Sequence, residues 1–190
     1  IGDSITSDRE SYFNIIREVL AGFEGLEFID ASMPGWRTCD ILDGFYSRIL
    51  NLKPHIASIM IGTNDLRRNN NESGKNNVGP DEYEANLDYM VGKLNHSGTK
   101  VILNTLPPFD NIRMNSAYGE NNWIYRTVDY QRYNEKIRKI GRKYNAVVDD
   151  MEEVYKAEDH GDILLYDGVH LNFKGQQALA QQIGRASCRE

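Results

Sequence analysis

The chain has 190 residues, of which 40% are hydrophobic and 26% are charged, as is typical of a single globular domain. Its formal net charge of −6 argues against nucleic acid as a partner, because nucleic acid requires a basic face, and also against docking on anionic membranes. No apolar run reaches the length of about 18 residues that a membrane-spanning helix needs.

In the first half of the chain, helix-like and strand-like hydrophobic patterns alternate. Apolar side chains recur at helical spacing in residues 11–23 and again in residues 39–52. Between them, residues 26–30 form a short apolar run that predicts a strand. Residues 55–61 are almost continuously apolar, which indicates a strand buried on both faces.

The second half continues the alternation, with longer loops. In chain order the patterns predict a polar loop at 67–79, a helix at 80–97, a strand at 101–106, a loop at 109–123, a helix at 128–144, a strand at 146–149 and a last helix that begins at 173–182. Strands that alternate with helices predict an α/β fold, in which a parallel sheet carries helices on both faces. We expect five strands, counting a truncated first strand that ends at Ile1, and no internal repeat or linker.

Both ends of the sequence look incomplete. The chain opens directly into the Gly2-Asp3-Ser4 segment, with no room for the strand that should come before it. Residues 183–190 break the helical pattern and resemble the translation of a sequencing adapter. We therefore expect one domain over residues 1–182 that lacks its first strand, followed by a non-native tail over 183–190. A signal peptide cannot be assessed on this basis, so no location is predicted.

Cysteines and histidines do not predict a disulfide framework or a metal site. Cys39 and Cys188 are the two cysteines, and Cys39 is expected to be a small core or surface residue. None of the four histidines lies three or four residues from another, as a zinc-binding cluster would require.

Four polar segments follow predicted strands or lie near the same edge of the predicted sheet. They are residues 2–4, 32–35, 62–65 and 167–170. Function in open α/β sheets sits at the carboxyl ends of the strands, so we expect these segments to converge.

Ser4 and His170 have the residue types of a nucleophile and its base. A serine hydroxyl is a poor nucleophile until a base takes its proton, and the base needs an acid that fixes its tautomer. Asp167, three residues before His170, can turn back to reach its Nδ1, and Gly168 makes such a turn easy. Taken alone, residues 2–4 would more often be a turn with a helix cap, and His170 alone a structural histidine.

An acyl-transfer transition state also needs donors aimed at the developing oxyanion. The backbone N–H groups of Ser4 and Gly35 and the side-chain amide of Asn64 can supply three such donors. For Asp3 and Asp65 a structural hydrogen bond is the favoured interpretation over a catalytic role. Tyr118, Trp123 and Tyr125 fit a substrate wall and loop packing equally well.

Together these segments resemble the SGNH hydrolases, also called GDSL esterases and lipases. The four blocks of that family are matched in order by Gly2-Asp3-Ser4-Ile5-Thr6, by Gly35 with Arg37-Thr38, by Gly62-Thr63-Asn64-Asp65 and by Asp167-Gly168-Val169-His170. The resemblance implies a flavodoxin-like, three-layer α/β/α sandwich and no metal or cofactor. It also implies that Ser4 is the nucleophile, His170 the base and Asp167 its partner, with Ser4, Gly35 and Asn64 lining the oxyanion hole.

Met33-Pro34 before Gly35 departs from the polar or glycine-rich run of many members. The predicted function is a serine esterase that removes short acyl groups, acetyl above all, from a small polar or carbohydrate substrate. Two alternatives stay open, a lysophospholipase or thioesterase and a non-catalytic carbohydrate-binding relative.

Overall fold

A computed structural model describes residues 1–69, 74–121, 123–156, 160–165 and 167–187. Three parallel strands, β1 (Ile56–Ile59), β2 (Lys100–Asn104) and β3 (Val147–Asp149), form a sheet in the order β1-β2-β3. The register pairs Ile56 with Lys100 and Ile102 with Val147.

Two isolated parallel bridges at Gly2 extend this sheet beyond its β1 edge. Gly2 pairs with Met60 just after β1 and with Ser32 on its other side. The chain therefore runs in the spatial order Ser32, Gly2, β1, β2, β3, which is the strand order of flavodoxin-like folds. Only three of the five expected strands are present in the described residues, so the five-stranded prediction is not confirmed.

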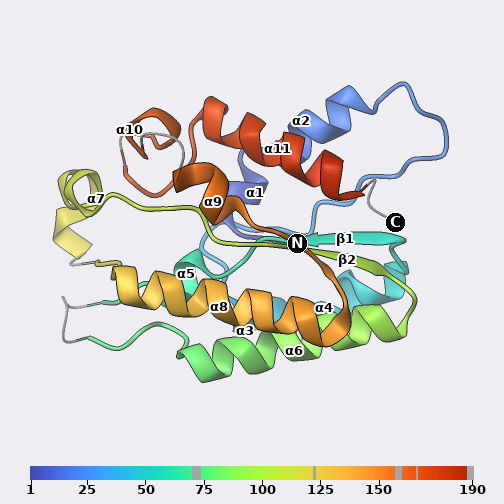
Figure 1. Ribbon diagram of the computed structural model, residues 1–190, viewed down its shortest axis with the longest axis horizontal. Helices are drawn as coiled ribbons and strands as arrows, with labels where there is room; N and C mark the ends of the chain where they lie inside the picture. Colours follow the sequence, from blue (N-terminus) through green and yellow to red (C-terminus); the bar gives the residue numbers. More distant parts are fainter. Residues whose placement is uncertain (70–73, 122, 157–159, 166, 188–190) are drawn as a thin grey trace.

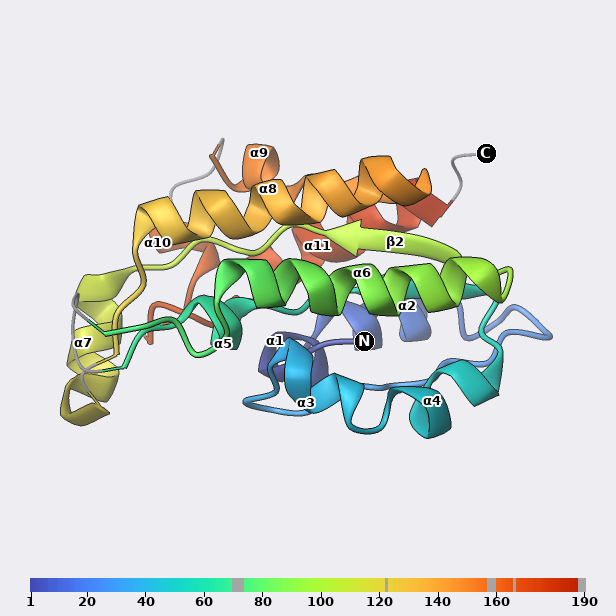
Figure 2. The same ribbon diagram turned by 90° about the horizontal axis from the view of Figure 1, so that it is seen from below.

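Helices cover both faces of the sheet (Figures 1 and 2). In chain order the helices are α1 (Ser4–Ser7), α2 (Tyr12–Val19), α3 (Thr38–Leu42), α4 (Phe45–Arg48), η1 (Leu50–Leu52), α5 (Thr63–Leu66), α6 (Pro80–His96), α7 (Asn111–Tyr118), η2 (Gly119–Asn121), α8 (Thr127–Tyr144), α9 (Met151–Lys156), α10 (His160–Ile163) and α11 (Phe173–Ser187). None of these described helices has both the length and the apolar character that crossing a membrane demands.

Each face of the sheet has its own hydrophobic core. On one face, α3, α4, α6 and α8 pack on the strands around Tyr83, Met90 and Tyr133, which are fully buried. On the other, α1, α2, α9, α10 and α11 enclose Met60 and Leu179. The three layers of the predicted α/β/α sandwich are confirmed.

The long amphipathic helices and the buried strands agree with the prediction. α6 and α8 lie within one residue of the expected bounds. β1 and β3 lie inside the predicted runs, and β2 begins one residue before the run predicted at 101–106. Pro80 begins α6, where a missing N–H costs nothing, and acids in its first turn favour the positive end of the helix dipole.

The strand predicted at 26–30 is wrong, because no strand lies there. Leu26 and Ile29 are 53% and 40% exposed. A strand needs a hydrogen-bonded neighbour, and the bridge from Gly2 reaches only Ser32. The helix predicted at 11–23 is likewise shorter, since α2 ends at Val19 and Phe23 is 65% exposed.

The helix predicted at 39–52 is broken into α3, α4 and η1. Asp43 and Gly44 separate α3 from α4, in keeping with the poor helix propensity of glycine. The loop predicted at 109–123 instead contains α7 and η2. Asp110 caps α7 by accepting hydrogen bonds from the N–H groups of Ile112 and Arg113 at 2.9 and 3.1 Å.

Near the C-terminus the structure differs from the expected break after residue 182. α11 continues to Ser187, and Ile183 is buried among the side chains of the second core. Cys188, together with residues 70–73 and 122 of the two predicted loops, lies outside the described residues. Cys39 is a half-buried free thiol.

Candidate active site

Ser4 is the first residue of α1 and follows immediately on the Gly2 bridges. The Asp3 side chain caps the helix by accepting from the Ile5 N–H at 3.0 Å. A Cβ on Gly2 would lie 2.0 Å from Oγ1 of Thr6 and 2.8 Å from the Met60 carbonyl oxygen, so only glycine fits there. This tight turn from sheet to helix places Ser4 at the carboxyl edge of the sheet.

Asp167 and His170 form a compact turn against Ser4. Oδ1 of Asp167 accepts from the backbone N–H groups of Val169 and His170, each at 3.0 Å. Oδ2 of Asp167 lies 2.6 Å from Nδ1 of His170, and Nε2 of His170 lies 2.8 Å from Oγ of Ser4. The structure thus brings together the acid, the imidazole and the hydroxyl, in the sequence of contacts that activates a serine.

Gly168 lets this turn dock against the start of α7. Its φ is +70°, in the left-handed region, and a Cβ there would lie 2.3 Å from the Asp110 carbonyl oxygen. The Asp110 N–H donates to the Gly168 carbonyl at 2.8 Å. Glycine is therefore required both by the backbone conformation and by the close approach of α7.

The two charged partners shift each other's pKa in opposite directions. Burial alone would raise the pKa of Asp167, but the hydrogen bonds from the His170 ring and from two backbone N–H groups hold it well below its usual range. The hydrogen bond to Asp167 raises the pKa of His170 above 6.5, against the opposing effect of burial. Asp167 is thus a carboxylate at neutral pH that stabilises a protonated His170.

Tyr118 is a further contact of the acid that the sequence analysis did not assign. Its hydroxyl donates to Oδ2 of Asp167 at 3.1 Å, and its ring centroid lies 5.2 Å from that of Trp123. An aspartate such as Asp110 can cap a helix, which is a sequence signal for α7 that the predicted loop at 109–123 leaves out. Nothing in the spacing indicated that this helix ends beside Asp167.

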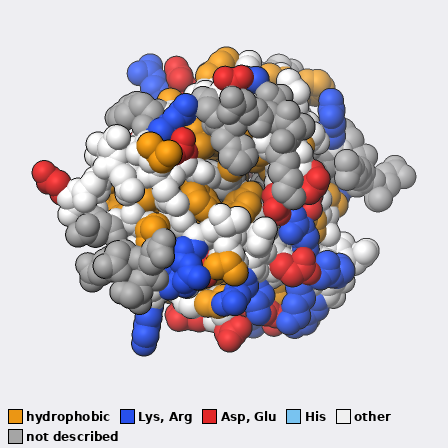
Figure 3. Space-filling view, turned by 60° about the vertical axis from the view of Figure 1, so that its left-hand side comes forward, with side chains coloured by type: hydrophobic (Ala, Val, Ile, Leu, Met, Phe, Trp, Pro, Cys, Tyr) orange, Lys and Arg blue, Asp and Glu red, His pale blue; other side chains and the backbone are white. Residues whose placement is uncertain are grey.

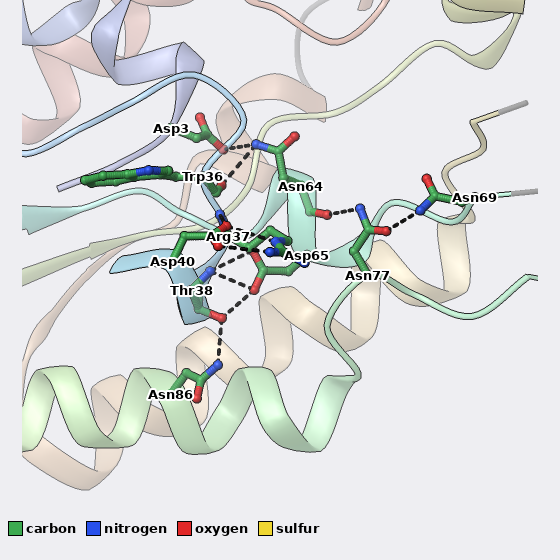
Figure 4. A network of polar contacts seen from close by, with 10 residues as sticks. All are labelled: Asp3, Trp36, Arg37, Thr38, Asp40, Asn64, Asp65, Asn69, Asn77 and Asn86. Carbon is green, nitrogen blue, oxygen red and sulfur yellow. Dashed lines mark hydrogen bonds and ion pairs between the residues drawn. The ribbon is translucent and has the colours of Figure 1, made fainter. Parts of the chain in front are cut away.

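Asn64 lies on α5 and is 8% exposed. Its side-chain amide donates to the Trp36 carbonyl oxygen at 3.1 Å and to Oδ2 of Asp3 at 3.5 Å, as Figure 4 shows. The backbone carbonyl of Asn64 in turn accepts from the side chain of Asn77 at 2.8 Å. These contacts fix the direction of the Asn64 amide at the edge of the site.

Gly35 lies on the exposed loop that ends at Trp36. The Met33 N–H donates to the Gly2 carbonyl at 3.3 Å at one end of this loop, and Trp36 accepts from Asn64 at the other. The structure therefore ties this loop to both the Ser4 turn and α5. Gly35 itself is not among the residues that line the pocket at Ser4.

Asp65 and Asp3 both make the structural hydrogen bonds that were favoured for them. Asp65 is fully buried and accepts from the N–H of Thr38 at 3.0 Å and from its hydroxyl, which also accepts from Asn86 (Figure 4). Burial raises the pKa of Asp65 to about 7 and that of Asp3 to about 6. Both carboxyl groups are committed to partners within the fold.

A pocket of about 40 Å³ opens beside Ser4. It is lined by Ser4, Thr63, Asn64, Arg67, Tyr118, Trp123, Tyr125, Val169 and His170. This end of the molecule shows hydrophobic side chains at its centre with Lys and Arg side chains close by (Figure 3). Trp123 and Tyr125 line this pocket and also pack against other aromatic rings, so both interpretations considered for them stay open.

A larger cavity of about 480 Å³ lies between α2, residues 25–31 and β1. Ser4 and His170 line the smaller pocket, and none of the candidate site residues lines the larger one. Within the described part of the chain, no group of three or more His, Cys, Asp and Glu side chains is arranged to hold a metal ion.

Comparison with known proteins gives one family match. Residues 1–178 match the model of the GDSL-like lipase/acylhydrolase family. A search of curated proteins found no match.

Several solved structures share the fold. The acetyl xylan esterase AlAXEase is 23% identical, with a TM-score of 0.77, and the match covers 97% of this chain and 96% of that one. A lipase/acylhydrolase from Enterococcus faecalis is 25% identical, with a TM-score of 0.77 over 97% of this chain and 91% of that one. Axe2, an acetylxylan esterase from Geobacillus stearothermophilus, is 23% identical, with a TM-score of 0.73 over 100% and 92%.

Proposed function

The chain belongs to the GDSL-like lipase/acylhydrolase family and is an ester hydrolase, and we propose that it acts through a covalent acyl-enzyme formed on Ser4. The observation that carries this proposal is the continuous line of contacts from Asp167 through His170 to Oγ of Ser4, at 2.6 and 2.8 Å. Distances of this kind are those at which a base can take a proton from its nucleophile.

In the first half of the reaction, Oγ of Ser4 attacks the ester carbonyl carbon while Nε2 of His170 takes the hydroxyl proton. The carbonyl oxygen becomes an oxyanion, for which the N–H groups of Ser4 and Gly35 and the amide of Asn64 are the proposed donors. The first N–H groups of a helix have no partner inside it, which suits Ser4 to this role. The tetrahedral intermediate then collapses, and His170 gives its proton to the departing alcohol.

In the second half, His170 takes a proton from water, and the resulting hydroxide attacks the acyl carbon. Collapse of this second intermediate breaks the bond to Oγ of Ser4, which regains a proton from His170, and the free acid leaves. Asp167 stays ionised throughout and stabilises the imidazolium in both halves.

The proposed substrate is a short acyl ester, acetyl above all, of a polar or carbohydrate alcohol. A pocket of about 40 Å³ at Ser4 favours a small acyl group over a long chain. Two of the similar solved structures are acetyl xylan esterases, which supports a search among acetylated sugars. We expect activity on nitrophenyl esters to fall steeply from acetyl to octanoyl, and a profile that rises toward long chains would contradict this substrate class.

Labelling with a fluorophosphonate tests the proposed nucleophile directly. The wild type should take one label and hydrolyse nitrophenyl acetate, and Ser4→Ala should lose both properties. Ser7→Ala changes a serine of the same short helix that does not line the pocket, so it should keep both. Ester hydrolysis that survives in Ser4→Ala would refute the mechanism.

A further inference from the structure

Two consecutive arginines after α5 are used in different ways. Arg68 is held by its backbone, which exchanges hydrogen bonds of 3.0 and 3.1 Å with Ile124. Its side chain donates to both carboxylate oxygens of buried Asp129, at 2.6 and 3.2 Å. Arg68 therefore joins the loop after α5 to the loop after α7 and is fully occupied in doing so.

The same pairing fixes where Arg67 points. Because Arg68 and Ile124 form an antiparallel bridge, side chains alternate on either side of it, and Arg67 falls on the same face as Trp123 and Tyr125. The contacts agree with this, since Cζ of Arg67 lies 3.9 Å from the centroid of the Trp123 ring. All three side chains line the pocket that holds Ser4 and His170.

Arg67 brings a positive charge into this pocket without a matching acid. The residues that line the pocket include no Asp or Glu. Nε of Arg67 is buried and has no hydrogen-bond partner, and no described carboxylate forms an ion pair with this side chain. Buried donors are normally satisfied, so an unsatisfied donor beside a reactive serine points to a group supplied by the ligand.

We propose that Arg67 is a specificity-determining residue that binds a carboxylate on the substrate. A guanidinium matches a carboxylate in a planar, two-pronged geometry, and stacking on an aromatic face holds it in place beforehand. This inference rests on the proposed function. Because the proposed acetyl group is uncharged, the carboxylate belongs to the alcohol part, and the substrate class is an acetyl ester of an acidic sugar.

A purely structural role for Arg67 predicts a different effect of its replacement from that of a carboxylate-binding role. If it served only to pack against Trp123, its replacement would weaken hydrolysis of charged and neutral esters to the same extent. A carboxylate-binding Arg67 changes the ratio between the two. The ratio is therefore the quantity to measure, because it cancels effects on folding and on the shared chemistry.

The experiment compares mono-acetylated methyl glucuronide with mono-acetylated methyl glucoside, which differ in carrying a carboxylate or a hydroxymethyl group on the same ring carbon. For the wild type we expect kcat/KM to be higher for the acidic sugar by about tenfold or more. This ratio corresponds to the binding free energy that one charge-assisted hydrogen bond contributes. Arg67→Gln should bring the ratio to about one, and Arg67→Lys should restore part of it. Arg17→Gln, which alters an arginine over the Phe13 ring outside this pocket, should leave the ratio unchanged.

Binding to the inactive Ser4→Ala variant separates this inference from the proposed function. Calorimetry should show tighter binding of the acidic sugar, and Arg67→Gln in the same background should abolish the difference. Equal binding of both sugars, or an equal loss on both in Arg67→Gln, would overturn the inference even if the wild type is an active esterase. If the wild type hydrolyses neither sugar while the Ser4→Ala variant still binds the acidic sugar more tightly, the proposed esterase mechanism is refuted and the inference about Arg67 stands.

Discussion

The hydroxyl of Tyr118 donates a hydrogen bond of 3.1 Å to Oδ2 of Asp167, the same oxygen that lies 2.6 Å from Nδ1 of His170. The Asp167 carboxylate is thus shared between a phenol and an imidazole. Two donors on one oxygen compete for the same negative charge. We therefore expect Tyr118 to weaken the interaction that raises the pKa of His170.

Replacing Tyr118 by Phe should strengthen the Asp167–His170 interaction. It should also let the Asp167 carboxylate move slightly, because one of its hydrogen-bond donors is lost. We expect the pKa of His170 to rise further, so the acid limb of the pH profile of kcat/KM moves to higher pH, and kcat to fall by about two- to tenfold. The phenyl ring retains the packing against Trp123. A pH profile identical to that of the wild type would show that the phenol does not act on the pair.

The pH dependence of activity should follow the ionisation of His170. Its pKa is raised by Asp167, and the base must be neutral to accept the Ser4 proton, so kcat/KM should fall as the pH drops through a value above 6.5. Asp167→Asn removes the charge that raises this pKa. We expect the limb to shift to lower pH and kcat to fall by about three to four orders of magnitude, in steady-state assays on nitrophenyl acetate.

Ser4, Asn64, Asp167 and His170 were predictable as site residues because each follows a predicted strand or lies near the same sheet edge. Ser4, Asn64 and the Asp167–His170 turn carry residue types that few other places in the chain combine, and parallel strands bring their carboxyl ends together whatever the lengths of the loops. The structure places them within hydrogen-bond reach of one another or around one pocket. Their roles stay predictions until the variants are measured.

Tyr118 and Arg67 could not be predicted in the same way. The position of Arg67 depends on the pairing of two loops through Arg68 and Ile124, and that of Tyr118 on the docking of α7 against the turn at Gly168. Contacts of this kind leave no periodic signal in a sequence. The strand at 26–30 failed for a related reason. Apolar residues describe what a strand would bury, but a strand also needs a partner for its backbone, and that is a property of the whole sheet.

Asn64 offers a test of the proposed oxyanion hole. Asn64→Ala removes the side-chain amide and should lower kcat by about 100- to 1,000-fold with a small effect on KM, because the donor acts on charge that develops in the transition state. Asn77→Ala is the matched control, since it removes an amide that holds the Asn64 backbone and does not line the pocket. An equal fall in kcat for both variants would assign Asn64 to loop structure.

The stability of the fold should decrease as the pH rises, because two buried acids, Asp3 and Asp65, lose their protons. The pKa values of Asp3 and Asp65 are raised by burial to about 6 and about 7. A carboxyl group whose pKa is higher in the folded state stabilises the fold while protonated, below about pH 4, and this is lost as the pH rises through the folded value. The free energy of unfolding can be measured by urea titration at about pH 5 and about pH 8. It should fall less between these values in Asp65→Asn than in the wild type or in the control Asp43→Asn, which alters an exposed acid.

Glycine at 168 should be far more sensitive to substitution than glycine at 25, although both have a positive φ, +70° and +83°. A Cβ at Gly25 meets nothing within 4 Å, so Gly25→Ala carries only the strain of a left-handed alanine, about 1 kcal/mol. A Cβ at Gly168 would lie 2.3 Å from the Asp110 carbonyl oxygen and 2.9 Å from Cβ of Arg113, neither of which can move without shifting α7.

Gly168→Ala should therefore cost about 3 kcal/mol of unfolding free energy, measured by urea titration. Because any relief of the clash moves the turn that carries Asp167 and His170, kcat should also fall by more than about 100-fold, whereas Gly25→Ala should keep wild-type kcat. A Gly168→Ala protein that loses stability but retains its kcat would mean that the 2.6 and 2.8 Å contacts of His170 tolerate displacement of the turn.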